Sequence, residues 1–471
     1  MLAWLYLGSE WIIRIGMIPI VLRRRRPESA LAWLTTIFFI PWIGLSAYVV
    51  FGRQRLGRRH VAQIREAVRV VRRTRRSGIE GESPARSGVP ARHHDLIALA
   101  ELVGAMPTRK GNHVEMISNS EAMVRRLIAD IDEAKHHVHI DMYIYADDET
   151  GARVNQALAR AVSRGVHCRL LVDAHGSRAF LAGSAGTLRR AGVEIYPQLS
   201  VSPFRLLLER IDVRNHRKLA VIDGRVGYVG SQNIVNPDYG SGHFGPWRDL
   251  TVRVTGPGVH QLQVVFMEDW YAERRVILSG DDLFPAPDQG GAVTIQIVPS
   301  GAAFEADALK DLIVAAIHEA EKRIIITTPY FIPGETALAA LRIAVRRGVR
   351  VDLVVPERAN HPIVSAAGRS YLRELARAGA NVYLHQSGLL HAKTITVDDA
   401  LAVIGSSNFD IRSFDLNLEL NLLLFGKQVS LDVLEQQELY IGESKAILRP
   451  DRPSRWGGLA EDAARLFSPL L

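Results

Sequence analysis

Two stretches of the chain repeat the same order of hydrophobic and polar positions. In 134–173, an apolar run typical of a strand is followed by a segment with helical apolar spacing and then, after Arg-Gly-Val, by a second apolar run. The stretch 320–356 repeats this order, including Arg-Gly-Val. Alternating strands and helices indicate α/β layers, so the pattern predicts two related α/β halves. The turn-rich stretch 279–291 marks the boundary between them.

The N-terminus has a different pattern. Residues 29–52 carry no charge, are rich in Ile, Leu, Phe and Trp, and are long enough to cross a hydrocarbon layer of about 30 Å. Residues 1–22 are also apolar but contain Glu10 and Arg14, which favours either a first transmembrane helix or an interfacial amphipathic helix. We therefore predict a membrane-anchoring region at 1–60 in which 29–52 is the stronger membrane segment.

Arginines flank this apolar segment on both sides, at 23–26 and again at positions 53, 55, 58 and 59. Because positive residues favour the cytoplasmic side, the rule assigns both flanks to the same side of the membrane. Two crossing helices would leave the 23–26 loop on the far side. The alternative is a re-entrant hairpin, in which Pro41-Trp42-Ile43-Gly44 turns the segment back.

A linker at 61–90 follows the apolar region. Its first part, 65–76, is rich in arginine and predicts a basic helix, suited either to anionic headgroups or to ordinary solvation. Its second part, 77–90, is rich in Gly, Ser and Pro and is predicted to be flexible. The two halves follow as predicted domains at 91–285 and 286–471.

Composition narrows the choice of partner. The 471 residues carry a net charge of +8, which favours an anionic partner. The positive excess is concentrated in 23–76, beside the apolar segment, and this favours an acidic membrane surface over nucleic acid. Cys168 is the only cysteine, so no internal disulfide forms, and a reducing compartment is favoured.

The strongest chemical signal is a motif that occurs once in each half. Each copy is a His-x-Lys-x4-Asp string followed at identical spacing by Gly-Ser-x-Asn. The first copy comprises His216, Lys218, Asp223, Ser231 and Asn233, and the second comprises His391, Lys393, Asp398, Ser406 and Asn408. On a strand of period two, the His and Lys of one copy point to the same face.

Two such copies, brought together, form a site suited to a phosphodiester. The lysines neutralise phosphoryl oxygens, one imidazole attacks phosphorus, and the other protonates the leaving oxygen. Only eight of the 58 basic residues are lysines, yet both motifs use lysine, whose compact charge suits a crowded phosphate. This chemistry requires neither a metal nor another cofactor.

The duplicated motif resembles the signature of the phospholipase D superfamily. Further segments look like bacterial cardiolipin synthases of the phospholipase D type, and with the apolar N-terminus the resemblance covers nearly the entire chain. These segments are Pro329-Tyr330-Phe331-Ile332-Pro333, the LLVDAHGS run ending at Ser177, Trp247-Arg248-Asp249-Leu250, Phe266 with Asp269-Trp270, and the closing 466–471. The resemblance implies two pseudo-twofold-related phospholipase D-like α/β/α sandwich domains after an N-terminal membrane segment, with one active site at their junction.

The resemblance also implies a function. The enzyme would be a phosphatidyltransferase that makes cardiolipin and glycerol from two phosphatidylglycerols, located at the bacterial cytoplasmic membrane with its catalytic domains on the cytoplasmic side. His216 would attack phosphorus and hold a phosphatidyl-histidine. His391 would protonate the departing glycerol and then activate the second phosphatidylglycerol. An exchange of these two roles stays open.

The same resemblance assigns roles to the other motif residues. The phosphoryl oxygens would be bound by Lys218, Lys393, Asn233 and Asn408, with support from Ser231 and Ser406. The downstream acids Asp249 and Glu419 would orient the imidazoles by hydrogen bonding. Asp223 and Asp398 belong to the catalytic motifs, but we expect a structural role because they lie far along the chain from the lysine.

Other functions stay open at this stage. A phospholipase D that hydrolyses its substrate would give phosphatidic acid, because transfer and hydrolysis differ only in which hydroxyl reaches the phosphoryl-histidine. Nucleases share the duplicated motif, whereas a non-catalytic scaffold would predict a broken copy, and both copies are intact. Acceptor choice and oligomeric state are not determined by the sequence.

Two further groups of residues have competing interpretations. The aromatics Tyr143, Tyr145, Tyr330 and Phe331 follow predicted strands, where lipid would be met, but core packing is favoured for any one of them. A run of histidines resembles a metal cluster on paper: His93, His94, His136, His137 and His139. No cysteine or close carboxylate accompanies them, so no metal site is expected.

Overall fold

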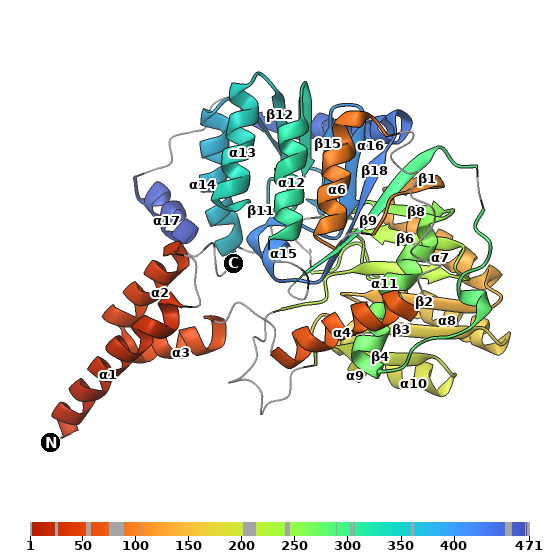
Figure 1. The fold of residues 1–471 in the computed structure, drawn as a ribbon, viewed down its shortest axis with the longest axis horizontal. Helices are drawn as coiled ribbons and strands as arrows, with labels where there is room; N and C mark the ends of the chain where they lie inside the picture. The colour runs from red at the N-terminus through yellow and green to blue at the C-terminus, as the bar shows by residue number, and fades with distance from the viewer. Residues whose placement is uncertain are drawn as a thin grey trace.

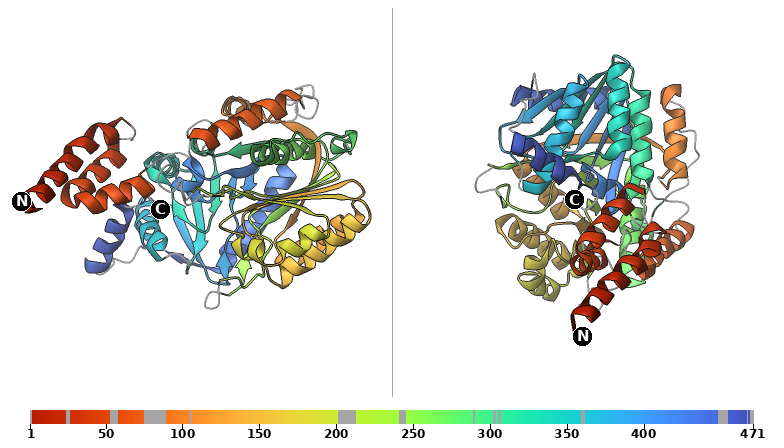
Figure 2. Two further views of the ribbon diagram at one scale, coloured as in Figure 1. Left: turned by 90° about the horizontal axis from the view of Figure 1, so that it is seen from below. Right: turned by 90° about the vertical axis from the view of Figure 1, so that its left-hand side faces the viewer.

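A single mixed sheet passes through both halves in the computed structural model, and helices cover both of its faces (Figure 1). The structure describes residues 2–23, 27–52, 58–74, 89–104, 106–200, 213–240, 245–288, 290–301, 304, 307–358, 362–447, 455–466 and 468. Three N-terminal helices project from this body, and the N-terminus lies farthest from it (Figures 1 and 2).

The sheet has fifteen strands in the order β19-β13-β12-β10-β15-β16-β18-β9-β1-β8-β6-β5-β2-β3-β4. The first half contributes β1 (Arg109–Ile117), β2 (His137–Met142), β3 (His167–Asp173), β4 (Glu194–Gln198), β5 (Lys218–Ile222), β6 (Val226–Gly230) and β8 (Thr251–Thr255). The second half contributes β9 (Val293–Ser300), β10 (Arg323–Thr327), β12 (Arg350–Pro356), β13 (Asn381–His385), β15 (Thr394–Val397), β16 (Leu401–Gly405), β18 (Glu419–Phe425) and β19 (Ser444–Ile447).

The strand order shows the internal pseudo-twofold. At the centre, β1 pairs with β9 in antiparallel orientation. Outward from this pair, β8-β6-β5-β2-β3-β4 on one side matches β18-β16-β15-β10-β12-β13 on the other, and β19 adds an edge strand to the second half. The duplication predicted from the sequence is therefore confirmed as one architecture used twice.

Each half is an α/β/α sandwich, as predicted. In the first half, α7 (Ser120–Glu133) packs beside α8 (Glu149–Ser163), which lies on β3, while α11 (Gly258–Arg274) contacts β5 and β8. In the second half, α12 (Ala308–Glu319) packs beside α13 (Gly334–Arg346), and α16 (Lys427–Gly442) contacts β15, β16 and β18. The described residues also include η1 (Ala91–His93), α6 (His94–Leu102), α9 (Arg178–Ala182), α10 (Ala185–Arg190), η3 (Asp281–Leu283), α14 (Pro362–Arg377), α15 (Ile411–Asp415), α17 (Arg455–Leu466), β7 (Trp247–Arg248), β11 (Phe331–Ile332), β14 (Leu389–Leu390) and β17 (Phe409–Asp410).

Local sequence explains why the repeated elements form. In α8, Val154, Leu158 and Ala161 recur at helical spacing and are fully buried. The helix starts at Asp148, whose side chain accepts a hydrogen bond from the backbone N–H of Gly151 at 2.9 Å. β2, α8 and β3 thus occupy 134–173, and β10, α13 and β12 occupy 320–356, as the periodicity predicts.

One helix from the first predicted domain, α6, packs on the second half. Leu96, Ile97 and Ala100 of α6 are buried in the hydrophobic core of the second half, where α6 contacts α12. The chain thus passes over the second half before it builds the first, as Figure 1 shows in orange beside α12. The division at 91–285 and 286–471 stays a prediction about independent units.

Helix α4 (Arg58–Thr74) begins just before the predicted linker, 61–90, and fills its first part. The helix is basic, as predicted, but it packs on α11 and buries Ile64 and Val71. Arg72 Nε also lies 2.7 Å from Glu268 Oε1, so a salt bridge attaches this helix to the body. Of the stretch predicted to be flexible, 77–88 lies outside the described residues.

The apolar N-terminus forms three helices: α1 (Leu2–Leu22), α2 (Pro27–Phe39) and α3 (Pro41–Phe51). The stretch 29–52 is broken at Ile40-Pro41 because proline lacks an N–H and clashes with the preceding turn. Among the described helices, only α1 is long and apolar enough to cross a membrane, over Trp4–Leu22. The prediction that 29–52 is the stronger spanning segment is therefore corrected in favour of α1. Residues 24–26 and 53–57, which carry several of the flanking arginines, lie outside the described residues.

Candidate active site

The two motifs meet because each one pairs with a segment of the other half. The backbone N–H of His216 donates to Leu418 O at 2.9 Å, next to an isolated β-bridge between Asn215 and Leu418. Likewise, the N–H of His391 donates to Arg248 O at 2.8 Å, beside the parallel pair β14 and β7. Each histidine is thus held one residue away from the other half's downstream acid.

This pairing produces two histidine–carboxylate pairs that cross the pseudo-twofold. His216 Nδ1 lies 3.0 Å from Glu419 Oε2, and His391 Nδ1 lies 2.6 Å from Asp249 Oδ1. An ionised carboxylate only accepts hydrogen bonds, so in each pair Nδ1 carries the proton. Nε2 of each imidazole is therefore the nitrogen that remains for chemistry.

The motif serines hold these carboxylates in place. Ser231 Oγ donates to Asp249 Oδ1 at 2.6 Å and accepts from the N–H of Leu250 at 2.9 Å. Ser406 Oγ donates to Glu419 Oε2 and accepts from the N–H of Leu420 at 3.0 Å. Both serines are fully buried, so their geometry favours support of the acids over direct contact with a phosphate.

The motif lysines are buried and anchored identically. Lys218 Nζ donates to His216 O at 2.6 Å, and Lys393 Nζ donates to His391 O at 2.7 Å. Burial lowers the pKa of Lys218 to about 8, although Glu419 and Asp249 oppose the shift. Burial also lowers the pKa of Lys393 well below its usual range, and Lys218 adds to this effect. The charge of each lysine acts on the other motif, so both copies share one electrostatic site.

Both imidazoles are buried strongly enough to stay neutral. Burial lowers the pKa of His216 to about 4, against the opposing charge of Glu419. Burial and then Lys393 lower the pKa of His391 to about 3. For Asp249, the effect of burial is outweighed by His391 and Lys393, which bring its pKa down to about 2. The resting site therefore combines neutral imidazoles with ionised carboxylates.

The motif asparagines occupy corresponding positions with different partners. Asn233 Oδ1 accepts a hydrogen bond from the N–H of Ile144 at 3.1 Å, which leaves its amide N–H groups as donors. The N–H of Asn408 donates to Ser413 Oγ at 3.2 Å, and its buried Oδ1 has no hydrogen-bond partner among the described residues. Both asparagines are more than nine-tenths buried.

The motif aspartates lie away from the imidazoles. Asp223 follows β5, and its carboxylate accepts the N–H groups of Lys135, His136 and His137 at 2.8 Å each. Asp398 follows β15 and accepts the three corresponding N–H groups at the start of β10, at 2.8–3.1 Å. This geometry favours the structural role expected for the two motif aspartates, because β5 or β15 separates each from its histidine.

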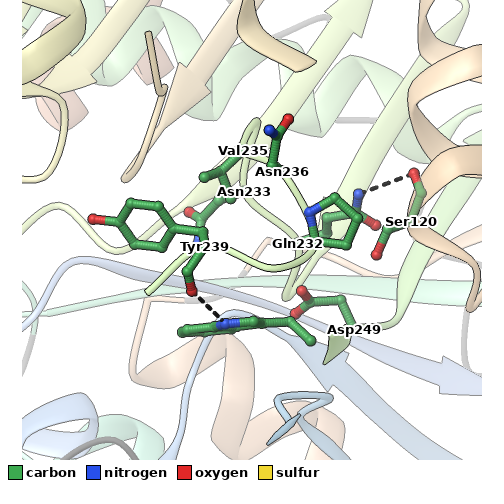
Figure 3. Close-up of a pocket in the computed structure, with 9 residues that line it drawn as sticks. Ser120, Gln232, Asn233, Val235, Asn236, Tyr239 and Asp249 are labelled. Carbon is green, nitrogen blue, oxygen red and sulfur yellow. Dashed lines mark hydrogen bonds between the residues drawn. The ribbon is translucent and has the colours of Figure 1, made fainter. Parts of the chain in front are cut away.

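A small pocket opens beside Asp249, the carboxylate that pairs with His391. Its polar lining includes Gln232, whose Nε2 donates to Ser120 O at 3.2 Å, and Figure 3 shows Asp249 below this pair. Trp247 also lines it and donates Nε1–H to Tyr239 O at 2.7 Å, and its ring packs against His391 with the two ring centroids 4.5 Å apart. Sequence reasoning used Trp247 only as a family marker and missed this contact, although it lies two residues before Asp249.

Three of the four aromatics after the strands separate into two groups, and the fourth, Tyr330, is half-buried. Tyr143 packs on the active site, with its ring centroid 4.8 Å from that of His216 and 5.1 Å from Lys218 Nζ. Tyr145 and Phe331 are core residues, buried against Phe180 and Phe409. The alternative interpretation, core packing, is therefore correct for Tyr145 and Phe331.

Two histidines of the sequence run have a structural explanation. His137 and His139 stack on each other at 4.4 Å, and both rings lie 3.1 Å from Gln263 Oε1. His139 also stacks on Phe266. Burial lowers the pKa of both imidazoles, so they behave as neutral core side chains.

Two α/β/α sandwiches related by a pseudo-twofold, with paired His-x-Lys motifs at their junction, define the class of this protein as the phospholipase D superfamily. The family described as "Cardiolipin synthase, PLD-like domain" matches residues 127–270 and 313–438, and the one described as "Phospholipase_D-nuclease N-terminal" matches residues 12–53. The chain belongs to the cardiolipin synthase family and is a phosphatidyltransferase, as its resemblance implied.

Curated relatives match along the full length. "Cardiolipin synthase A" of Serratia proteamaculans (strain 568) is 32% identical over 479 residues, covering 100% of this chain and 99% of the relative. "Cardiolipin synthase A" of Klebsiella pneumoniae is 33% identical over 486 residues, covering 99% and 98%. Among solved structures, the phosphatidylserine synthase of Haemophilus influenzae Rd KW20 superposes with a TM-score of 0.60 at 16% identity, covering 76% of this chain and 95% of that one, which supports the fold alone.

Proposed function

We propose that this protein synthesises cardiolipin by transferring a phosphatidyl group from one phosphatidylglycerol to another, with release of glycerol. The observation that carries the proposal is the pair of crossed histidine–carboxylate contacts in one buried site with two lysines. Such a site supplies a nucleophile, an acid–base partner and charge for the phosphoryl oxygens. The full-length similarity to proteins named cardiolipin synthase supports this choice of product.

In the first step, Nε2 of neutral His216 attacks the phosphorus of the donor lipid. A P–N bond forms, the P–O bond to glycerol breaks, and His391 donates its Nε2 proton to the departing oxygen. Glu419 fixes the tautomer and orientation of His216 through the Nδ1 contact at 3.0 Å. Lys218 and Lys393, with the amide of Asn233, bind the phosphoryl oxygens.

In the second step, His391 acts as the base. It takes the proton from the terminal hydroxyl of the second phosphatidylglycerol, whose oxygen attacks phosphorus, and the P–N bond to His216 breaks. His391 regains the proton that it gave up in the first step, so the cycle returns both imidazoles to their starting state. Asp249, ionised in the resting site, stabilises the imidazolium form of His391.

Substrate binding would charge the general acid. His391 is neutral in the resting site, with a pKa lowered to about 3. A phosphodiester brings a negative charge into a buried site, which raises the pKa of nearby cationic groups. Lipid binding is therefore coupled to uptake of a proton by His391. The general acid becomes protonated only when a phosphate is bound.

The protein would act at the bacterial cytoplasmic membrane with its catalytic halves on the cytoplasmic side. Support comes from the apolar helix α1 and from the arginine-rich flanks, which the positive-inside rule assigns to the cytoplasm. Its partners would be anionic phospholipids, phosphatidylglycerol and cardiolipin, and not nucleic acid.

The test is a product assay on the purified full chain in mixed micelles with phosphatidylglycerol labelled in its phosphate and in its head-group glycerol. We expect cardiolipin with an equal amount of free glycerol from the wild type, and neither product from His216→Ala or His391→Ala. Phosphatidic acid in place of cardiolipin would mean that water is the acceptor and that the enzyme is a hydrolase. No turnover of any phospholipid, together with cleavage of a nucleic acid, would overturn the proposal.

A further inference from the structure

The three N-terminal helices differ in how far each can reach into a bilayer. At about 1.5 Å per residue, the 21 residues of α1 extend ~31 Å, while the 13 of α2 and the 11 of α3 extend only ~20 Å and ~17 Å. The hydrocarbon core is about 30 Å thick, so α1 matches a full crossing and neither α2 nor α3 does. Length alone therefore separates one spanning helix from two shorter ones.

Packing shows that α2 and α3 form a hairpin against α1. All three helices contact one another around a small core that includes Ile13, Val21, Trp33 and Ile37. A Cβ placed on Gly44 would lie 2.7 Å from the Cα of Ile37, so only a residue without a side chain fits where α3 returns past α2. Figure 2 shows α1 pointing away from the body toward the N-terminus and α3 returning toward the body.

The turn of this hairpin lies beside Arg14, in the middle of α1. Arg14 Nε donates to the carbonyl oxygen of Phe38 at 2.9 Å. Pro41 starts a new helix at this point, so the last carbonyls of α2 have lost their helical donors. Arg14 also pairs with Glu10 at 3.1 Å and stacks over the rings of Trp11 and Phe38. Arg14 thus satisfies a carbonyl of the broken backbone, and Glu10 pairs with the charge of Arg14.

Three hydroxyl side chains of the bundle are paired within their own helices. Ser9, Thr36 and Ser46 each donate to a carbonyl three or four residues earlier in their own helix, at 2.6–2.9 Å. Backbone and side-chain polar groups in a hydrocarbon layer must be paired internally in this way. The same helices expose large apolar side chains, among them Trp4, Ile12, Leu31, Phe39 and Ile43.

We propose that α1 crosses the membrane once, that α2 and α3 form a re-entrant hairpin in the leaflet nearer the catalytic body, and that Arg14 seals the turn at Ile40-Pro41. The occupant of the exposed apolar surface is lipid. This arrangement places both arginine-rich flanks on the side of the catalytic body and the N-terminus on the other, so both flanks satisfy the positive-inside rule. The proposal does not depend on which phospholipid the enzyme makes.

Cysteine labelling in sealed vesicles of both orientations tests this topology. Cys168 is buried, and Cys168→Ala gives a cysteine-free background for single cysteines. The reporters are a cysteine in a short Gly-Ser extension before Met1, Arg23→Cys at the end of α1, Trp42→Cys beside the turn, and Ala62→Cys at an exposed position of α4. Each variant is treated with a membrane-impermeant maleimide before and after detergent.

We expect Arg23→Cys and Ala62→Cys to be labelled from the same side, the extension from the opposite side, and Trp42→Cys only after detergent. Labelling of Arg23→Cys and Ala62→Cys from opposite sides would mean two crossings and would overturn the proposal. Labelling of the extension from the same side as Ala62→Cys would mean that no helix crosses, and would overturn it equally.

The role of Arg14 is tested in the Trp42→Cys variant with a membrane-permeant maleimide, which reacts only where water ionises the thiol. Arg14→Leu leaves the Phe38 carbonyl unpaired, so we expect water at the turn and a several-fold rise in labelling. Ile15→Leu, on the exposed face of the same helix, is the matched control and should leave labelling unchanged. Equal labelling in Arg14→Leu and the control would overturn the sealing role.

Discussion

In the first half, the residue between the motif histidine and lysine is Arg217, and in the second half it is Ala392. Arg217 is only 1% exposed, forms an ion pair with Asp269, and donates Nε–H to Glu419 O at 3.1 Å. Ala392 lies in an apolar core instead. The residues just before the motif histidines also differ in polarity. Asn215 donates to Asp141 at 2.8 Å, whereas Leu390 is buried among apolar side chains.

The groups aimed at the site are nevertheless the same in both halves. Each copy has a histidine bound to an acid of the other half, a lysine bound to its own histidine's carbonyl, and an aspartate that accepts three strand N–H groups. The same arrangement of catalytic side chains can therefore be held in place by a buried ion network in one half and by an apolar core in the other. Either surrounding works as long as it packs closely and leaves no buried charge unpaired. The reacting groups have no such freedom.

The crossed acids are the part of this comparison that matters most for function. Each half contains one histidine and the acid that serves the other half's histidine. Neither half is therefore a complete catalytic unit, even though each has its own hydrophobic core. Catalysis therefore requires the junction between the two halves.

The largest expected effect separates the two histidines. We expect His216→Ala and His391→Ala each to reduce cardiolipin synthesis by on the order of 10⁴-fold, because one loses the nucleophile and the other the acid. A phosphodiester with a p-nitrophenol leaving group needs no acid in the first step. Its burst of nitrophenol should persist in His391→Ala and vanish in His216→Ala, and the reverse pattern would exchange the two roles.

The crossing of the acids gives the next effect. Asp249→Asn should reproduce the defect of His391→Ala, and Glu419→Gln that of His216→Ala, each with a loss on the order of 10²- to 10⁴-fold. The p-nitrophenyl substrate should therefore rescue the burst in Asp249→Asn only. Rescue of Glu419→Gln instead would show that each acid serves the histidine of its own half.

Substitution of Arg217 tests how much the buried ion pair stabilises the first half. Arg217→Met leaves Asp269 as an uncompensated buried charge, and we expect about 3–5 kcal/mol loss of stability. The double variant Arg217→Met/Asp269→Leu removes both charges and should lose less. Thermal unfolding of the full chain in detergent measures both, and Ala392→Ser provides a mild change at the corresponding position. A double variant less stable than Arg217→Met would contradict the ion-pair account.

The motif aspartates should behave alike in the two halves. Asp223→Asn and Asp398→Asn weaken three backbone hydrogen bonds each, at a cost of about 1–3 kcal/mol. Turnover per folded molecule should change little, because neither carboxylate contacts the imidazoles. A large loss of turnover at an unchanged unfolding temperature would mean that these two aspartates take part in the chemical step.

The smallest effect concerns pH. The pKa of His216 falls from its usual range to about 4 on folding, so below pH ~6.5 the unfolded chain binds a proton that the folded site does not. Stability should then decrease as the pH falls from ~6.5 to ~4, by about 1–2 kcal/mol for this histidine at pH 5. His216→Gln cannot take up that proton, so its unfolding temperature should fall less between pH 7 and pH 5. An identical pH dependence would mean that His216 titrates normally.

Much of the site was predictable because its signals are local in the chain. The spacing of His216 and Lys218 predicts that the two residues act together at a strand. In the structure β5 begins at Lys218, His216 lies just before it, and Lys218 Nζ donates to His216 O. Asp249 and Glu419 were found as candidates for orienting acids, but their crossing was not, since it depends on contacts between residues about 140 and 200 positions apart. Trp247 was missed as a neighbour of His391 for the same reason.

The duplicated α/β halves, the paired motifs and the apolar N-terminus were predictable from the chain alone, because periodicity and motif spacing are properties of neighbouring residues. Long-range contacts set the rest: which acid pairs with which histidine, the packing of α6 on the second half, and the hairpin of the apolar stretch, where Arg14 donates to Phe38 O. Those outcomes depend on how the strands close into one sheet and on which buried polar groups must find a partner, and neither is encoded in any single segment.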